Sequence, residues 1–176
     1  MKYILDFDDT LYDAKSFKEL VARDGAGSLL FTPEIWQHYD VRTYLHIDTL
    51  DWLRQKSKDD LFILTAAMTS DGKTVMEYQK EKLRCSKLGD MVSDIIFSEG
   101  DKGVDAASIA KQFPPDETIV FVDDKIEQCL SVQSAVPQAI VCLMVRDPEQ
   151  IGNVDSVRGI HVVHTLADVD GIIEKL

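Results

Sequence analysis

Residues 4–10 read ILDFDDT, and this short stretch decides how the rest of the chain is read. Apolar residues precede Asp6, so residues 3–6 are typical of a strand that is buried on both faces. Asp6 and Asp8 are two residues apart, which near a strand end points both carboxylates to the same side. Two carboxylates that close repel each other unless one is protonated or a cation lies between them. The stretch therefore predicts a strand that ends in a charged site.

Beyond that strand, short apolar runs alternate with longer helical patterns. This alternation predicts an α/β fold, a three-layer Rossmann-like domain with helices on both faces of a mostly parallel sheet of five to six strands. Strands are expected at residues 3–6, 61–65, 95–98, 118–123, 139–144 and, with a weaker pattern, 159–164. Core helices are expected at residues 47–55, 71–87, 104–113, 126–135 and 167–175, the second beginning at a capping Ser70 or Asp71.

One stretch interrupts this alternation. Residues 13–45 follow the first strand where a crossover helix is expected, and they are rich in aromatic residues. We expect them to form a small helical cap, with short helices at 14–23 and 33–39, while residues 1–12 and 46–176 form the core domain. In open parallel sheets the ligand site lies beyond the carboxyl ends of the strands. A cap that leaves the first strand is therefore well placed to cover that site.

Polar residues follow the carboxyl ends of four expected strands and should meet at one edge of the sheet. In chain order they are Asp6 and Asp8, then Thr65, then Lys102, then Asp123 and Asp124. So many carboxylates nearly require a hard cation with oxygen ligands. Mg²⁺ suits them because it binds a few carboxylates and keeps water or phosphate oxygens as its other ligands. The ammonium of Lys102 and the hydroxyl of Thr65 can then hold the remaining phosphoryl oxygens.

These four motifs, in this order, resemble those of the haloacid dehalogenase-like superfamily, and the resemblance spans the whole chain. The superfamily's DxDxT motif stands at residues 6–10, its strand-end hydroxyl is Thr65, its lysine at a helix start is Lys102, and its acidic pair is Asp123-Asp124. The resemblance implies a haloacid dehalogenase-like core with a small helical cap after the first motif. It also implies a Mg²⁺-dependent phosphatase that hydrolyses a phosphate monoester through an aspartyl-phosphate on Asp6.

The resemblance implies a catalytic role for four of these residues. Asp6 is expected to attack phosphorus, and Asp8 to protonate the leaving oxygen and then activate water. Thr65 and Lys102 are expected to bind the phosphoryl group and to offset charge in the transition state. Dehalogenating members lack an aspartate at the position of Asp8, so its presence favours phosphate ester chemistry.

The resemblance also implies ligands for the metal and contacts for the substrate. The metal ligands are expected to be Asp6, the backbone carbonyl of Asp8 and Asp124. Asp123 is expected either to bind the metal itself or to contact one of its ligands. The expected substrate-site residues are Thr10, which would orient Asp8, and Ala66. The composition of the cap adds Arg42, which is expected to reach the substrate together with one aromatic residue of the cap. Two positions depart from the superfamily's pattern. Ala66 stands where many relatives have a polar residue, and Gln128 stands where they commonly have Asp or Asn.

The charge and composition of the chain limit which classes of partner it is expected to bind. The net charge is −12, with 31 acidic against 19 basic residues, which argues against a nucleic-acid partner. The sequence shows neither an apolar run long enough to cross a bilayer nor a signal-peptide pattern, and its three cysteines form no CxxC pair. We therefore expect a cytoplasmic protein, monomeric or homodimeric, without a membrane partner, that acts on a phosphorylated small metabolite or nucleotide.

Three other functions remain open from the sequence. A small cap leaves the site accessible, so a protein phosphatase is possible. A phosphotransferase or mutase would use the same residues but a sugar hydroxyl in place of water. A weakly active metal- or phosphate-binding module is the third alternative, although every primary catalytic group is present.

Overall fold

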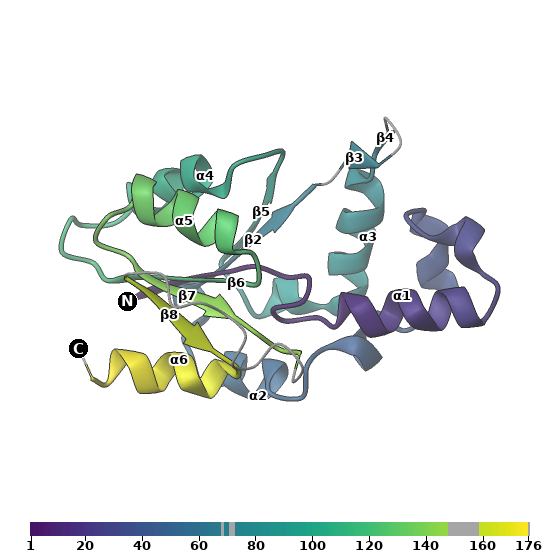
Figure 1. Cartoon of the computed structure of the whole chain (residues 1–176), viewed down its shortest axis with the longest axis horizontal. Coiled ribbons are helices and arrows are strands. Elements are labelled where there is room, and N and C mark those ends of the chain that lie inside the picture. The colour runs from purple at the N-terminus through teal and green to yellow at the C-terminus, as the bar shows by residue number, and fades with distance from the viewer. Residues whose placement is uncertain (68, 71–72, 148–158, 176) are drawn as a thin grey trace.

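In the computed structural model, which describes residues 1–67, 69–70, 73–147 and 159–175, the central element is a six-stranded sheet. Its order is β5-β2-β1-β6-β7-β8, and each strand runs parallel to its neighbours (Figure 1). The strands are β1 (Lys2–Leu5), β2 (Leu61–Ala66), β5 (Asp94–Ser98), β6 (Ile119–Asp123), β7 (Ile140–Met144) and β8 (Ile160–Val163). The six predicted strands and the Rossmann-like α/β fold class are therefore confirmed.

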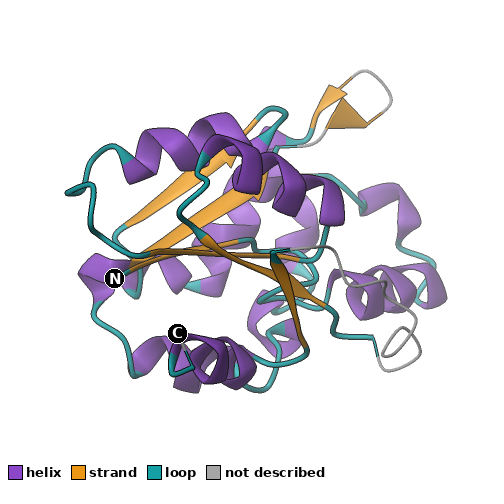
Figure 2. Ribbon diagram, turned by 60° about the vertical axis from the view of Figure 1, so that its left-hand side comes forward, coloured by secondary structure: helices purple, strands orange, loops and turns teal. Residues whose placement is uncertain are grey.

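Helices cover both faces of this sheet (Figure 2). On one side lie α4 (Lys102–Ala110) and α5 (Ile126–Ala135), and on the other α2 (Thr49–Arg54) and α6 (Leu166–Ile173). Successive strand side chains alternate between the two layers: Ile4 is buried with the α4–α5 side, whereas Tyr3 and Leu5 belong to the other buried cluster. This double burial explains why the strands read as continuous apolar runs rather than as alternating ones.

A helical segment lies beyond the carboxyl end of β1. It contains α1 (Ala14–Arg23), as predicted, and the 3₁₀ helices η1 (Gly27–Leu29), η2 (Pro33–Gln37) and η3 (Val41–Tyr44). The helix predicted at 33–39 is thus a shorter 3₁₀ helix. α3 (Met76–Ser86) packs against η2 and η3, and the indole of Trp36 donates a hydrogen bond to the Tyr78 carbonyl. The division into a core domain and a cap at residues 13–45 stays a prediction.

The start of α3 differs from the prediction. Where the sequence pattern suggested a helix from residue 71, the helix begins at Met76, and a short antiparallel hairpin of β3 (Thr69–Ser70) and β4 (Lys73–Thr74) precedes it. Ser70, one suggested cap, belongs to β3, and the other, Asp71, lies outside the described residues. Threonine and valine are β-branched, which favours an extended backbone over the first turn of a helix.

The last helix, α6, contacts α2 through a hydrogen bond and a nearby ion pair. The Trp52 indole on α2 donates a 2.9 Å hydrogen bond to Asp170 on α6, and the Trp52 ring meets Tyr3 edge-on at 5.2 Å. Lys56 adds a 2.7 Å ion pair to the same carboxylate. Within the described ranges, no helix has the length and apolar character that crossing a membrane requires.

Candidate active site

A buried lysine shared by two aspartates forms the centre of the candidate site. β1 and β6 are neighbours in register, so Asp6, just after β1, and Asp123, the last residue of β6, leave the sheet side by side. Lys102 is the first residue of α4 and reaches both carboxylates, with its Nζ 2.5 Å from Asp6 Oδ1 and 2.7 Å from Asp123 Oδ2. All three side chains are buried.

Burial and charge together set the ionisation of this group. Burial raises the pKa of Asp6 well above its usual value; Lys102 opposes this shift, while Asp123 and Asp124 add to it. Burial alone would lower the pKa of Lys102, but the charges of Asp6 and Asp123 outweigh burial and leave that pKa raised. Lys102 therefore stays protonated at neutral pH. Its single positive charge does not balance the carboxylates of Asp6, Asp123 and Asp124, so an additional cation would stabilise the cluster.

The third carboxylate of the cluster, on Asp124, shows where that charge fits. Oxygens of Asp6, Asp123 and Asp124 lie within 4.8 Å of one another. The Oδ1 atom of Asp124 is buried and has no hydrogen-bond partner among the described residues. Burial, together with the charge of Asp123, raises the pKa of Asp124 to about 6. An orphaned carboxylate oxygen facing two others fits a hard divalent cation such as Mg²⁺, because such ions take oxygen ligands.

Neighbouring segments hold Lys102 in place. Its backbone N–H donates a 2.9 Å hydrogen bond to the side chain of Gln128 on α5, one of the two positions that depart from the superfamily pattern. The N–H of Gly103 donates to the Ser131 hydroxyl at 3.0 Å, and Asp101 caps α4 by accepting from the same N–H. A Cβ on Gly103 would lie 2.7 Å from the Ser131 backbone oxygen, so only glycine permits this approach of α4 to α5.

A second group of side chains, which sequence reasoning missed, holds Asp8. The amide of Gln79 on α3 donates to Asp8 Oδ2 at 2.7 Å and to the hydroxyl oxygen of Thr65 at 2.9 Å. Lys82, one turn further along α3, donates to Asp8 Oδ1 at 2.5 Å. Burial would raise the pKa of Asp8, but Lys82 and the Gln79 hydrogen bond outweigh burial and lower it. Asp8 is therefore ionised at neutral pH.

The three predicted substrate contacts lie in different places. Ala66 lines the cavity described below. Thr10 is fully buried and is not among the cavity's lining residues; its hydroxyl oxygen has no hydrogen-bond partner among the described residues, and its carbonyl accepts two hydrogen bonds from Arg146, at 2.9 and 3.1 Å. Arg42 is exposed on η3 and is not among the residues that line the cavity.

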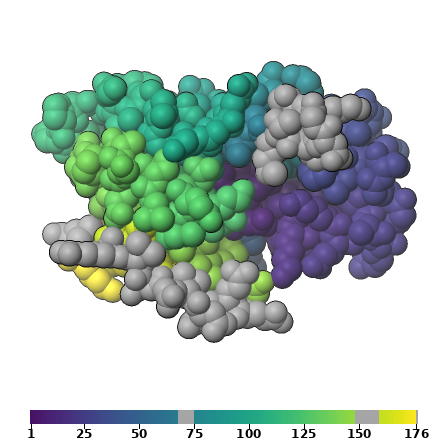
Figure 3. Space-filling model, turned by 45° about the horizontal axis from the view of Figure 1, so that its top comes forward, coloured from purple at the N-terminus to yellow at the C-terminus, as the bar shows by residue number. Residues whose placement is uncertain are grey.

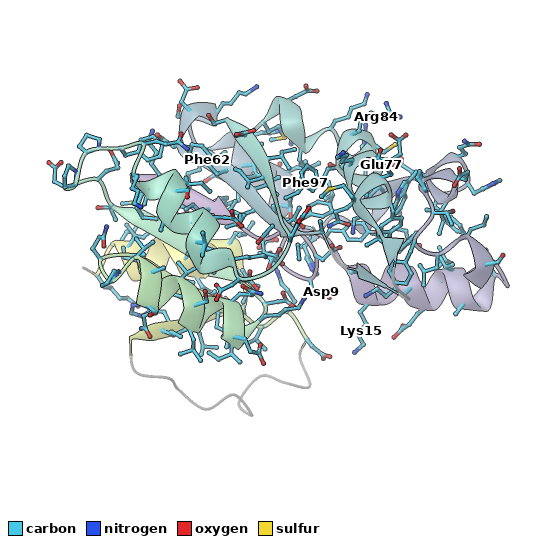
Figure 4. The ribbon with its side chains drawn as sticks, turned by 90° about the horizontal axis from the view of Figure 1, so that it is seen from above. Asp9, Lys15, Phe62, Glu77, Arg84 and Phe97 are labelled. Carbon is cyan, nitrogen blue, oxygen red and sulfur yellow. The ribbon has the colours of Figure 1, made fainter. Side chains whose placement is uncertain are left out.

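A cavity of about 220 Å³ is lined by members of both the Asp6–Asp124 cluster and the group of side chains around Asp8. It lies between the sheet and the helical segment, and its lining comprises Asp6, Asp8, Asp9, Ala14, Phe17, Lys18, Phe31, Thr65, Ala66, Val75, Tyr78, Gln79, Lys82, Asp124 and Lys125. Seen from above, Asp9 lies at this junction, next to Lys15 at the start of α1 (Figure 4). On the surface, the junction is where the purple N-terminal residues meet the teal and green core (Figure 3).

Solved structures share this fold along nearly the whole chain. A haloacid dehalogenase-like hydrolase from Streptococcus pneumoniae matches with a TM-score of 0.56 and 17% identity, covering 98% of this chain and 97% of that one. A D,D-heptose 1,7-bisphosphate phosphatase from B. bronchiseptica, crystallised with magnesium and phosphate, matches with a TM-score of 0.60 and 16% identity, covering 100% of both chains. The L-2-haloacid dehalogenase from Xanthobacter autotrophicus matches with a TM-score of 0.63 and 12% identity, covering 99% and 98%.

These likenesses establish the haloacid dehalogenase-like fold, which the sequence motifs predicted. No protein-family model matches the sequence, and a search of curated proteins finds no match. A phosphatase and dehalogenases are both among the similar structures, so the fold alone does not choose a reaction. That choice depends on the side chains of this site.

Proposed function

We propose that this protein is a Mg²⁺-dependent phosphatase that hydrolyses a small phosphate monoester through an aspartyl-phosphate on Asp6. The observation that carries the proposal is the Asp6–Lys102–Asp123 cluster with, beside it, an Asp124 oxygen that no described residue hydrogen-bonds. A nucleophilic carboxylate, a fixed ammonium and a cation site then lie together, and Asp6 and Asp124 of this cluster line the cavity. The presence of Asp8 favours phosphoryl transfer over dehalogenation.

The chain's own residues supply the steps. The Asp6 carboxylate attacks phosphorus, and the bond from phosphorus to the leaving oxygen breaks as the new bond to Asp6 forms. Lys102 and Thr65 hold phosphoryl oxygens and offset the charge that develops on them. Asp8 gives a proton to the leaving oxygen and later takes one from the water that releases phosphate from Asp6. A dianionic phosphate near Asp8 favours its protonated form before the first step, because like charges repel.

The cation has its own place in this scheme. Asp6 and Asp124 would hold it, with Asp123 and the backbone carbonyl of Asp8 as further candidate ligands. Bound Mg²⁺ neutralises phosphoryl charge that would otherwise be repelled by a protein of net charge −12. The cavity of about 220 Å³ favours a small-molecule ester, since pockets for drug-sized ligands begin at about 300 Å³.

The test is hydrolysis of p-nitrophenyl phosphate with Mg²⁺ and with a chelator. We expect activity with Mg²⁺, loss on chelation, and no detectable turnover by Asp6→Asn. An exposed carboxylate on α2 offers the control, Asp51→Asn, which should keep full activity. Acid-quenched enzyme should carry one phosphoryl group on the peptide that contains Asp6, as read by mass spectrometry. Near-normal turnover by a folded Asp6→Asn protein would end the covalent mechanism.

A further inference from the structure

The cavity lining combines the charged and polar groups of the proposed reaction with aromatic and apolar side chains. The aromatic ones are Phe17 and Phe31 from the helical segment and Tyr78 from α3, whose ring also lies 5.1 Å from the Lys82 ammonium. Phe17 and Tyr78 are 1% and 5% exposed and belong to the hydrophobic core, so packing accounts for them. Phe31 is different.

Phe31 stays exposed although the core lies next to it. Its side chain is 37% exposed, and its ring meets the edge of Tyr78 with 5.6 Å between ring centroids. Its backbone has φ of 67°, in the left-handed region that bulky residues rarely adopt. The neighbouring Thr32 donates a side-chain hydrogen bond to the Leu29 carbonyl, which fixes the turn. A strained backbone that holds an exposed ring against a cavity is typical of a ligand contact.

We propose that the preferred substrate is the phosphate monoester of a small aromatic alcohol, whose ring packs against Phe31. This inference rests on the proposed phosphatase function. The cavity has room for a phosphoryl group and one ring but is below the volume of pockets for larger ligands. With the phosphoryl group at Asp6, the leaving ring contacts Phe31, where an edge-to-face contact stabilises it. The P–O bond to the aryl oxygen breaks as Asp6 gains the phosphoryl group, and the aryl oxygen takes the proton held by Asp8 and leaves as the free aromatic alcohol.

The cavity also offers a rival means of recognition. Lys18 and Lys125 line it, and neither side chain forms an ion pair within the described ranges. They could bind a second anionic group on the leaving group. Both lysines are exposed, whereas the ring of Phe31 packs against the buried Tyr78, so we favour the ring. The two modes predict different substrates and respond to different substitutions.

The experiment compares phenyl phosphate with glycerol 3-phosphate and phosphoglycolate across four variants, Phe31→Ala, Phe31→Tyr, Leu130→Ala and Lys18→Met. Phe31→Ala should lower kcat/KM for phenyl phosphate about fivefold to tenfold, mainly through KM, and leave glycerol 3-phosphate unchanged. Phe31→Tyr should restore most of the loss, because it returns an aromatic ring. Leu130→Ala truncates an exposed apolar residue on α5, away from the cavity lining, and should change neither substrate.

Three outcomes decide between the alternatives. An equal loss on phenyl phosphate and glycerol 3-phosphate would make Phe31 a structural residue and overturn the inference. A preference for phosphoglycolate that Lys18→Met abolishes would also overturn it, in favour of a second anionic group. Hydrolysis of none of the esters by correctly folded, Mg²⁺-loaded protein would remove the phosphatase assignment itself, a failure that is distinct from a wrong leaving group.

Discussion

The ammonium of Lys82 lies 2.5 Å from a carboxylate oxygen of Asp8, inside a surround of aromatic rings. The rings of Phe7, Tyr12 and Tyr78 lie with their centroids 5.1–5.2 Å from the ammonium nitrogen. Burial lowers the pKa of Lys82, and the charge of Asp8 only partly opposes this. The ion pair thus connects α3 to the loop after β1 and holds the Asp8 carboxylate.

We expect Lys82→Met to reduce kcat strongly. Methionine keeps much of the volume but removes the charged hydrogen bond, which is worth about 2 kcal/mol, or about 30-fold in rate if it acts in the transition state. Steady-state kinetics with p-nitrophenyl phosphate checks this. Lys80→Met, on the exposed face of the same helix, is the matched control and should retain activity. Unchanged kcat in Lys82→Met would mean that this ion pair does not orient Asp8.

Mg²⁺ should stabilise the protein in a pH-dependent way. The pKa of Asp124 is raised from 3.8 to about 6, so its protonated form stabilises the metal-free protein below pH 3.8, and this contribution is lost as pH rises through about 6. Mg²⁺ needs the ionised carboxylate. We therefore expect Mg²⁺ to raise Tm clearly at about pH 7.5 and little at about pH 5.

Thermal unfolding with and without Mg²⁺ at both pH values measures this effect. Asp124→Asn should abolish the shift, while Asp116→Asn, which replaces an exposed carboxylate, should keep it. An equal Mg²⁺ shift at both pH values, or one that survives in Asp124→Asn, would place the cation elsewhere.

Removing Lys102 should cost stability as well as activity. Lys102→Met leaves two buried carboxylates without their shared ammonium, and breaking such a buried pair costs about 3–5 kcal/mol. Urea unfolding in the presence of chelator measures the loss, and added Mg²⁺ should recover part of it by replacing the missing charge. The exposed Lys111→Met is the control. A loss no larger than the control's would show that the carboxylates are held neutral.

Gly103→Ala should displace Lys102. The added Cβ meets the Ser131 backbone, and overpacking of this kind costs about 1–3 kcal/mol. Because the clash lies beside Lys102, kcat should fall more than the stability loss alone explains. Gly171→Ala on α6 is a matched control, since its Cβ would meet no atom of the described residues within 4 Å, and it should be neutral or stabilising. The comparison needs kcat and urea unfolding for both variants. Equal kcat and equal stability in the two variants would contradict the close approach of α4 to α5 at Gly103.

The sheet and the centre of the site could be predicted because strand ends are marked in the sequence. A parallel sheet brings the residues after its strands to one edge, so knowing that Asp6, Thr65 and Asp123 end strands was enough to place them together. Lys102 follows from the same rule, since it begins the helix after β5. The catalytic roles of these residues stay predictions, which the variants above test.

Gln79 and Lys82 were missed because side-chain direction on a helix depends on its packing partners. The sequence did hold a signal, since both residues share the buried stripe of α3 with Leu83 and Ser86. A lysine on such a stripe needs a buried partner, and Asp8 is that partner. The hairpin before α3 had a signal as well, because Asp71-Gly72 is a dipeptide favoured in two-residue hairpin turns. The helical pattern that follows was wrongly extended over it.

The two tryptophans of the chain make its two regions separately visible by fluorescence. Trp36, in the helical segment, packs on Phe17 and on Tyr78 of α3. Trp52 contacts Tyr3 and donates a hydrogen bond to Asp170 in the α2–α6 layer of the core. A Trp36→Phe protein therefore reports only on the core, and a Trp52→Phe protein only on the helical segment. Denaturation curves that coincide would describe one cooperative unit, and curves that separate would reveal a segment that opens while the sheet stays folded.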